Sequence, residues 1–328
     1  MQLLPSILFA LALFAEQASA HGYVNQIAVD GKWYPGNKPG SDSQLGPSPI
    51  RLISDGGPLQ LQGSEARDFV CGKNASKAQM TVPANTSSLV TFNWVGMDGA
   101  SAWIHHAGPV ITYMTSCGSQ SCDAFDATVD TKWFKVAQLG QLPNDTGRWF
   151  QEGISSERTY VFQLPDQLAP GGYLIRHELI SLQNAVAPNG IEFYPMCLQV
   201  NVSSEGQQQP NTTVTFPAIY NSSTDGLIFD TYTPPVPAYP FPGGPLSNVH
   251  ASGQGLGPTA PSLSAIPTTS QTDSASDAPQ CSVAPPEKQG STSSAVRSHD
   301  SQPPNGRCLV KRNTGRRAAH NAGLRRAW

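Results

Sequence analysis

The residue with the most distinctive chemical potential in this sequence is His21, because of what precedes it. His21 follows the small-residue triplet Ala18-Ser19-Ala20, a pattern that signal peptidase cuts. Cleavage there would make His21 the first residue of the mature chain. Its free α-amine and imidazole Nδ1 could then bind one metal ion together. The alternative is that His21 only marks the cleavage point.

Two further stretches carry side chains that could complete such a site. His105 and His106 stand just before Gly108-Pro109, a turn signal that would place a histidine on a loop at the end of a strand. A histidine there can equally be an ordinary hydrogen-bonded loop residue. In an extended segment, Glu192 and Tyr194 would share one face by the period-two alternation of strands. Three separate segments therefore offer imidazole, phenol and carboxyl groups.

Residues 1–20 have the composition of a secretory signal peptide. The apolar run Leu3–Phe14 is too short to cross a bilayer as a helix, and small residues follow it. We therefore expect a secreted, extracellular protein. Six Asn-x-Ser/Thr sequons agree with passage through a glycosylating pathway: Asn74, Asn85, Asn144, Asn201, Asn211 and Asn221.

The composition narrows the class of protein. Charged residues make up only 13% of the chain and the formal net charge is −3, which argues against nucleic-acid binding. The 30 Gly and 29 Pro residues suit a turn-rich β protein. The sequence has no second apolar run of membrane-spanning length. We expect no membrane span and a monomer.

Short runs of alternating or β-branched apolar residues, separated by turn residues, continue to about Leu246. This pattern predicts an antiparallel, immunoglobulin-like or fibronectin-like β-sandwich with long loops and short loop helices. The clearest strand candidates are residues 23–29, 88–94, 109–114, 159–164, 172–180 and 193–200.

The chain changes character after Leu246. Residues 21–246 are predicted to form one domain, whereas residues 247–328 are rich in Ser, Thr and Pro and end in a strongly basic stretch. Such a segment cannot bury a core, so we predict a disordered tail. The basic end is either simply solvated or makes an electrostatic contact with anionic wall polymers or a membrane surface.

Separate motifs together resemble a known enzyme family. The sequence resembles the fungal copper-dependent lytic polysaccharide monooxygenases of auxiliary activity family 9, formerly classed as glycoside hydrolase family 61. The resemblance runs from His21 to about Leu246. It rests on Ala18-Ser19-Ala20-His21-Gly22-Tyr23-Val24, His106-Ala107-Gly108-Pro109-Val110, Tyr173-Leu174-Ile175-Arg176-His177-Glu178, Glu192-Phe193-Tyr194-Pro195-Met196-Cys197 and Tyr239-Pro240-Phe241-Pro242-Gly243-Gly244-Pro245.

The resemblance implies a copper site and a reaction. His21 would bind one copper ion through its amine and Nδ1, His106 would add its ring nitrogen, and Tyr194 would be the axial oxygen. The family pattern His-x-Gly-Pro selects His106 over its neighbour His105. Three nitrogens in a plane with a distant axial oxygen suit Cu(II).

The implied reaction hydroxylates C1 or C4 of β-1,4-linked chains such as cellulose, or a hemicellulose. It would use O2 or H2O2 and an external small-molecule or protein electron donor. The expected partner is therefore a polysaccharide surface. Tyr34 and Tyr239 are candidates for stacking on the sugar, although either could equally be a structural tyrosine.

The sequence departs from the family beside the expected copper. Where the family commonly has Ala-Leu-His and Gln-x-Tyr, this chain has Ser181-Leu182-Gln183 and Glu192-Phe193-Tyr194. We expect Gln183 and Glu192 to act in oxygen activation, with Glu192 as a hydrogen-bond donor or a base according to its protonation. The departure leaves two alternatives open: a secreted, non-catalytic copper-binding protein, or a carbohydrate-binding sandwich without redox activity.

The six cysteines include no CxxC pair, so disulfides are expected in a secreted chain in place of a zinc cluster. We predict the disulfides Cys71–Cys197 and Cys117–Cys122. The former would hold the strand that carries Tyr194. Cys281 and Cys308 could pair with each other in the tail.

Overall fold

The computed structural model of the chain describes residues 21–41, 46–157 and 159–251. All of these described residues belong to one compact unit. The predicted signal peptide, residues 1–20, lies outside the described residues, as do Cys281, Cys308 and residues 252–328 of the predicted tail.

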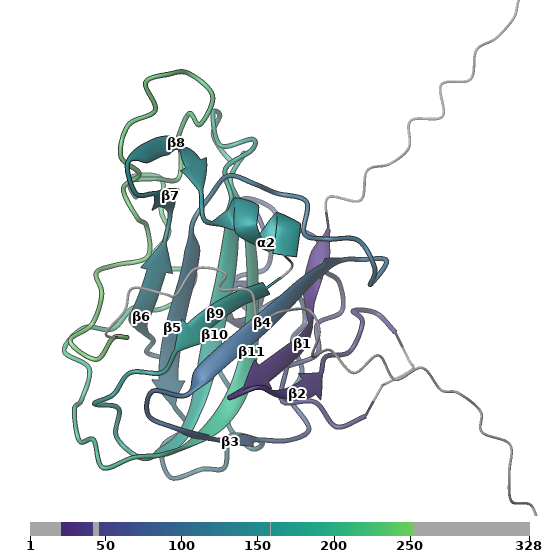
Figure 1. Ribbon diagram of the computed structural model, residues 1–328, viewed down its shortest axis with the longest axis vertical. Coiled ribbons are helices and arrows are strands. Elements are labelled where there is room, and N and C mark those ends of the chain that lie inside the picture. Colours follow the sequence, from purple (N-terminus) through teal and green to yellow (C-terminus); the bar gives the residue numbers. More distant parts are fainter. Residues whose placement is uncertain (1–20, 42–45, 158, 252–328) are drawn as a thin grey trace, which may run out of the picture. The chain divides into compact units, whose positions relative to one another are not determined.

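Two sheets form a β-sandwich, as the sequence predicts. The first sheet has the strand order β2-β1-β4-β9 and the second the order β3-β11-β10-β5-β6, and Figure 1 shows the first lying across the second. The strands are β1 (Gly22–Val29), β2 (Lys32–Pro35), β3 (Val82–Asn85), β4 (Leu89–Gly96), β5 (Val110–Ser116), β6 (Phe134–Leu139), β9 (Thr159–Gln163), β10 (Gly171–Ser181) and β11 (Glu192–Ser203).

The remaining elements lie between these strands. A small hairpin pairs β7 (Gln141–Leu142) with β8 (Asp145–Trp149). Two short helices, α1 (Asp68–Cys71) and α2 (Gln151–Glu157), fulfil the expectation of helices in long loops. All six predicted strands are present. Every strand pair is antiparallel except β3 with β11, which is parallel.

Strand β1 begins directly after His21, which places that residue at an end of the sandwich. Gly22 pairs with Gly96 at the end of β4, and the backbone amide of Met97 donates to the carbonyl of His21 at 3.2 Å. The other end of β1 turns at Asp30-Gly31, where both residues have positive φ angles, 48° and 80°. Such a turn suits the twist of a two-residue hairpin and returns the chain as β2.

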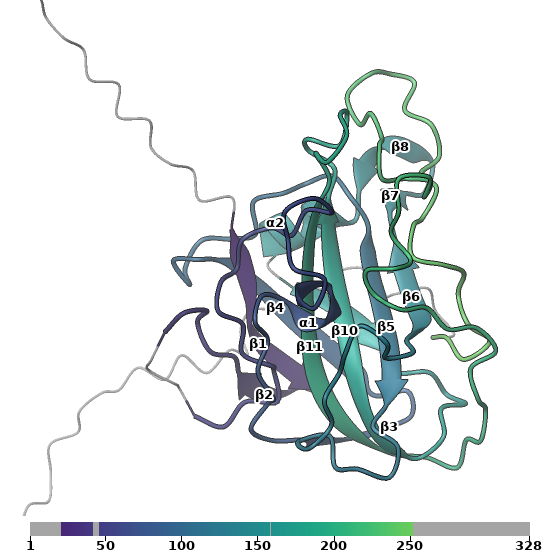
Figure 2. The same ribbon diagram turned by 180° about the vertical axis from the view of Figure 1, so that it is seen from behind.

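The second sheet is buried on both faces. One face packs against the first sheet in a core that includes Ile175 and Leu179. The opposite face is covered by α1 and by the loops that follow β6 and β11, with Leu174 and Ile180 in that second core. Figure 2 shows α1 lying over β11. Because this central strand is covered on both sides, every residue of β10 from Tyr173 to Ser181 is buried, including the polar Arg176-His177-Glu178.

Arg176 and Glu178 on β10 are fully buried and form an ion pair at 2.5 Å. The Arg176 guanidinium also donates to the carbonyl of Phe69 at 2.9 Å. Glu178 accepts a 2.6 Å hydrogen bond from the hydroxyl of Tyr220. Because each charge has a partner from another element, this pair ties α1 and the loop after β11 to the centre of the sheet.

Replacing Arg176 with methionine is expected to lower the free energy of unfolding by about 3 kcal/mol or more, because Glu178 would remain buried without its counter-charge. Denaturant unfolding measures the change. Adding Glu178→Gln removes the orphaned charge and should recover part of the loss. Equal stability of Arg176→Met and the natural protein would contradict this account.

The structure forms both predicted disulfides, Cys71–Cys197 and Cys117–Cys122. The first joins α1 to β11 across a sequence separation of 126 residues. Closing a loop of that length contributes about 5 kcal/mol in the chain-entropy model. Since Cys197 lies three residues after Tyr194, this bond also fixes the strand that presents the tyrosine.

Packing on the domain continues past the predicted boundary at about residue 246. Ser247, Val249 and Ala251 are buried. The amide of Ser247 donates to the carbonyl of Lys135 and that of Ala251 to the carbonyl of Val136. The segment therefore packs along β6 as part of the domain. No helix in the described part of the chain is both long and apolar enough to span a membrane.

Candidate metal centre

His21 is half-buried and its ring lies against the backbone of Gly57. A Cβ atom on Gly57 would fall 2.5 Å from Cδ2 of His21, so only glycine allows the loop to approach so closely. The amide of Gly22 donates to the carbonyl of Gly56 at 3.2 Å. The loop before α1 thus forms a cradle for the first imidazole of the predicted site.

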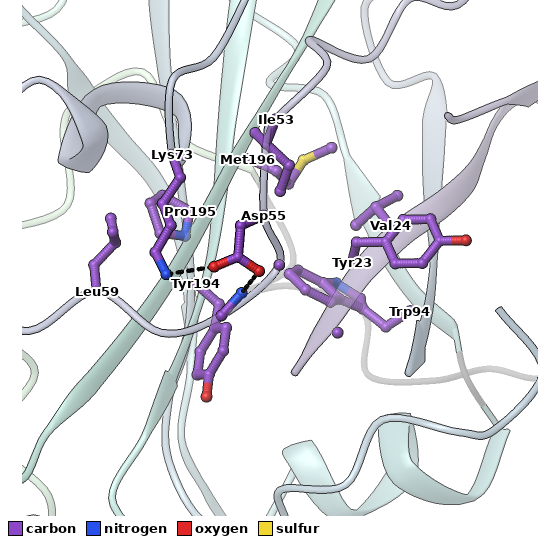
Figure 3. Close-up of a pocket in the computed structure, with 14 residues that line it drawn as sticks. Tyr23, Val24, Ile53, Asp55, Leu59, Lys73, Trp94, Tyr194, Pro195 and Met196 are labelled. Atoms are coloured by element: carbon purple, nitrogen blue, oxygen red, sulfur yellow. Dashed lines mark hydrogen bonds and ion pairs between the residues drawn. The ribbon is translucent and has the colours of Figure 1, made fainter. Parts of the chain in front are cut away.

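A shallow hollow links this loop to Tyr194 (Figure 3). Asp55, Gly57, Lys73 and Tyr194 are among its lining residues. The carboxylate of Asp55 accepts hydrogen bonds from Nζ of Lys73 at 2.7 Å and from the amide of Gly57 at 3.1 Å. Burial opposes ionisation of Asp55, but these contacts with Lys73 and Gly57 prevail and lower its pKa. The ionised carboxylate therefore holds the Gly57 loop in place.

Tyr194 comes from β11 and is buried. Its hydroxyl donates to Oε2 of Glu192 at 2.9 Å, and its ring meets that of Trp103 edge-on with centroids 4.8 Å apart. Burial, and then the charge of Glu192, raise the pKa of Tyr194 well above its usual value. Tyr194 consequently remains a neutral phenol across the working range of an enzyme.

The two adjacent histidines are in different environments. His106, which the family pattern selects, is exposed. His105 is only 3% exposed. Nδ1 of His105 lies 2.9 Å from Oε1 of Gln183, and Nε2 lies 3.1 Å from the hydroxyl of Tyr194. The family pattern assigns no role to His105, yet the structure places it among the predicted site residues.

Helix α2 positions this histidine loop. Oε1 of Gln151 accepts a 3.1 Å hydrogen bond from the indole of Trp103, and Ser155 donates to the carbonyl of His105 at 2.6 Å. Gly108 completes the turn with φ of 140°, and a Cβ there would lie 1.9 Å from the carbonyl oxygen of Ile180. Figure 1 shows α2 at the same end of the sandwich as the start of β1.

The residues that depart from the family pattern, Gln183 and Glu192, lie on either side of His105. Gln183 is exposed, whereas Glu192 is buried, with Oε2 3.5 Å from Nε2 of His105. Asn184 donates to the other oxygen of Glu192 at 3.4 Å. The structure therefore brings Gln183, Glu192 and Tyr194 together, with the His105 imidazole between them.

The two tyrosines expected to stack on a sugar are both buried, which corrects that expectation. Tyr34 is 7% exposed and packs into the core between the sheets. Tyr239 is 6% exposed. Its hydroxyl donates to the carbonyl of Gly226 at 2.9 Å, and its ring packs edge-on against Trp149. Both tyrosines are structural residues, because their rings pack within the apolar clusters of the two cores.

An exposed apolar patch does adjoin the site. Among the described residues, six large hydrophobic side chains are exposed, and four of them flank the histidine loop or Gln183: Ile104, Val186, Ile228 and Tyr232. Tyr232 is 61% exposed, and its hydroxyl donates to the carbonyl of Gln183 at 2.9 Å. The amide of Phe229 donates to the carbonyl of Ala185 at 2.9 Å, which brings Ile228 and Val186 to the same surface.

The donor set suits copper. Imidazole nitrogens with a phenol oxygen are ligands that Cu(II) accepts in tetragonal geometry. Gly57 leaves room for the His21 ring, and the hydroxyl of Tyr194 faces the histidine loop. Within the ranges that the structure describes, no three His, Cys, Asp or Glu side chains gather as a metal site. The predicted set differs from such a group because it includes a main-chain amine and a phenol.

All six sequon asparagines, Asn74, Asn85, Asn144, Asn201, Asn211 and Asn221, are exposed. Their exposure leaves each side chain accessible to a glycan.

Comparison with known proteins gives consistent matches. The model of Auxiliary Activity family 9 (formerly GH61) matches residues 21–239, beginning at His21. AA9 family lytic polysaccharide monooxygenase D of Gloeophyllum trabeum is 44% identical over 251 residues, which cover 76% of this chain and 70% of that protein. AA9 family lytic polysaccharide monooxygenase B of Malbranchea cinnamomea is 36% identical over 74% of this chain and 98% of its own length.

Solved structures agree with these sequence matches. The extended catalytic domain of LPMO9A from H. jecorina superposes with a TM-score of 0.62 at 28% identity, over 72% of this chain and 97% of that one. A cellulose-active polysaccharide monooxygenase from M. thermophila has a TM-score of 0.57 at 25% identity, over 72% of this chain and 100% of its own.

Proposed function

The chain belongs to Auxiliary Activity family 9, the copper-dependent lytic polysaccharide monooxygenases, and from this premise we propose that it hydroxylates C1 or C4 of a β-1,4-linked glucan such as cellulose, or of a hemicellulose. The cosubstrate would be O2 or H2O2, with an external electron donor. The observation that carries the proposal is that two loops approach Tyr194: the Gly57 loop, which lies against the ring of His21, and the loop of His105 and His106.

Copper would be held by His21, through its amine and Nδ1, by a ring nitrogen of His106 and by the phenol oxygen of Tyr194. When bound, copper supplies one-electron redox chemistry and activation of the oxygen cosubstrate. Burial, and then the charge of Glu192, raise the pKa of Tyr194 and favour its neutral phenol. Glu192, in contact with the Tyr194 hydroxyl, is the nearest carboxyl to hold or deliver a proton there.

The shape of the site favours a polymer that lies on the surface. The hollow beside the proposed ligands, which Gly57 and Tyr194 line but none of the histidines does, has a volume of only about 20 Å³, close to the space that one water needs. A sugar ring cannot enter it. The exposed patch of Ile104, Val186, Ile228 and Tyr232 instead offers apolar surface beside the metal site, and surfaces of this kind mark interaction sites.

The similar protein from M. thermophila is called cellulose-active, which supports cellulose as the first polymer to test. Secretion and glycosylation are also part of the proposal, and they rest on the composition of residues 1–20 and on the exposed sequons. The family relationship favours the enzyme over the non-catalytic copper-binding protein that the sequence left open.

Replacing Tyr232 with alanine is expected to weaken binding to the polysaccharide about fivefold, since loss of an aromatic contact of about 1 kcal/mol gives that change. A pull-down with insoluble polymer measures it. Leu89→Ala, which removes another exposed apolar side chain at the far end of β4, is the matched control. Equal loss in both variants would exclude a specific role for Tyr232.

The proposed reaction is tested by incubating the copper-loaded protein with a reductant and cellulose, xyloglucan or xylan. Mass spectrometry should detect aldonic acids from C1 oxidation or 4-keto sugars from C4 oxidation. A protein that binds copper tightly but yields no oxidised product on any of these polymers would refute the proposal.

A further inference from the structure

We propose that His105 is a positioning residue of the copper site: its imidazole joins Gln183 to the Tyr194–Glu192 pair and thereby fixes the axial oxygen and the Gln183 amide. The proposal rests on the copper site described under the proposed function. It concerns a residue that the family pattern does not select as a ligand. At the position of Gln183 the family commonly has a histidine, and in this chain His105 brings an imidazole next to that position.

Both ring nitrogens of His105 have partners inside the protein. Oε1 of Gln183, 2.9 Å from Nδ1, is an amide oxygen and can only accept, so Nδ1 carries the proton and donates. That hydrogen bond fixes the tautomer and leaves the Nε2 lone pair 3.1 Å from the hydroxyl of Tyr194, so that Nε2 and Oε2 of Glu192 are the two acceptors within reach of the single phenol proton. His105 thereby helps to hold the phenol of Tyr194 in place, while the ring of the exposed His106 remains available to the metal.

The surroundings hold the ring of His105 in one orientation. Trp103 packs edge-on against it with ring centroids 5.0 Å apart, and the carbonyl of His105 accepts a 2.6 Å hydrogen bond from Ser155 on α2. Since His105 is also almost completely buried, its contacts with Tyr194 are set by the fold. Movement of the ring would displace the axial oxygen.

The same contact orients Gln183. With Oε1 held by His105, the amide nitrogen of this exposed residue is turned away from the imidazole. It becomes available to donate to a group bound at the metal or to the substrate. Where the family commonly has a single histidine after β10, this chain thus has two groups: the imidazole of His105 from the loop before β5 and the amide of Gln183 after β10.

The test begins with His105→Phe, which keeps a ring against Trp103 but removes both nitrogens. His106→Phe is the matched control. For His105→Phe we expect copper binding to persist, the electron paramagnetic resonance spectrum of Cu(II) to change, and oxidation of the polymer to fall about tenfold or more. For His106→Phe we expect loss of copper binding. An unchanged spectrum in His105→Phe, or loss of copper from that variant together with retention in His106→Phe, would overturn the proposal.

A second pair of variants moves the imidazole from position 105 to position 183. This pair tests the proposal even if His105→Phe folds poorly. His105→Ser alone should alter the Cu(II) spectrum and lower activity, and Gln183→His added to it should restore both in part. A purely structural role of His105 predicts no recovery of the spectrum. Because the spectrum reports on Cu(II) without turnover, this arm remains decisive even if the protein oxidises none of the polymers.

Discussion

A chain that carries one additional residue before His21 is expected to bind Cu(II) about a hundredfold more weakly than the chain that begins at His21, if the lost metal–nitrogen bond is worth about 3 kcal/mol. The extra residue turns the α-amine into an amide, which no longer offers a neutral amine nitrogen. The imidazole of His21 then binds without its chelating partner.

Isothermal titration of the apoprotein measures this effect. The matched control is the same extended chain after proteolytic removal of the additional residue, which should recover the full affinity. Binding should also weaken on acidification in the His21 form, because protons compete for both nitrogens. Equal copper affinity of the extended and trimmed chains would mean that the amine is not a ligand.

The second large effect concerns stability in acid. His177 on β10 is fully buried. The indole of Trp94 donates to its Nε2 at 3.2 Å, and Nδ1 lies 3.3 Å from the hydroxyl of Thr112. Burial, and then the charge of Arg176, lower the pKa of His177 to about 3. The folded protein therefore keeps this imidazole neutral at pH values where the unfolded chain protonates it.

The sign of the pH dependence follows from that difference. The unfolded chain binds more protons between pH 6.5 and about 3, so the contribution of His177 is present above 6.5 and is lost as the pH falls. Over that window the loss reaches about 5 kcal/mol. Denaturant unfolding at a series of pH values should show the slope. His177→Gln, which keeps a donor and an acceptor, should flatten it, and an unchanged slope in that variant would contradict the assignment.

Alternation of apolar residues was sufficient to predict six of the strands, because these pack against the core on at least one face. It missed β2 and β3, which have only four residues each, β6, whose apolar residues are interrupted by Lys135 and Gln138, and the hairpin strands β7 and β8. The Asp30-Gly31 pair would have indicated β2, since it is a strong signal of a two-residue hairpin. The parallel pairing of β3 with β11 is a long-range contact that local patterns do not encode.

The site was predictable in part, since Gln183, Glu192 and Tyr194 do meet. His105 was missed because a motif selects one histidine and says nothing about its neighbour. Burial alternates along this loop, with Trp103 and His105 buried and Ile104 and His106 exposed. A large apolar residue at position 103 could therefore have indicated that His105, two residues later, is buried as well. Tyr239 was misassigned because its sequence context does not reveal the aromatic cluster that buries it.

We propose that a processed N-terminus at His21 makes this chain a copper-dependent enzyme that oxidises polysaccharide. The most direct test compares the yield of oxidised oligosaccharides, by mass spectrometry, from copper-treated chains that begin at His21 and chains with one additional residue before it. We expect aldonic acids or 4-keto sugars from the former and almost none from the latter. Equal yields from both chains would contradict it.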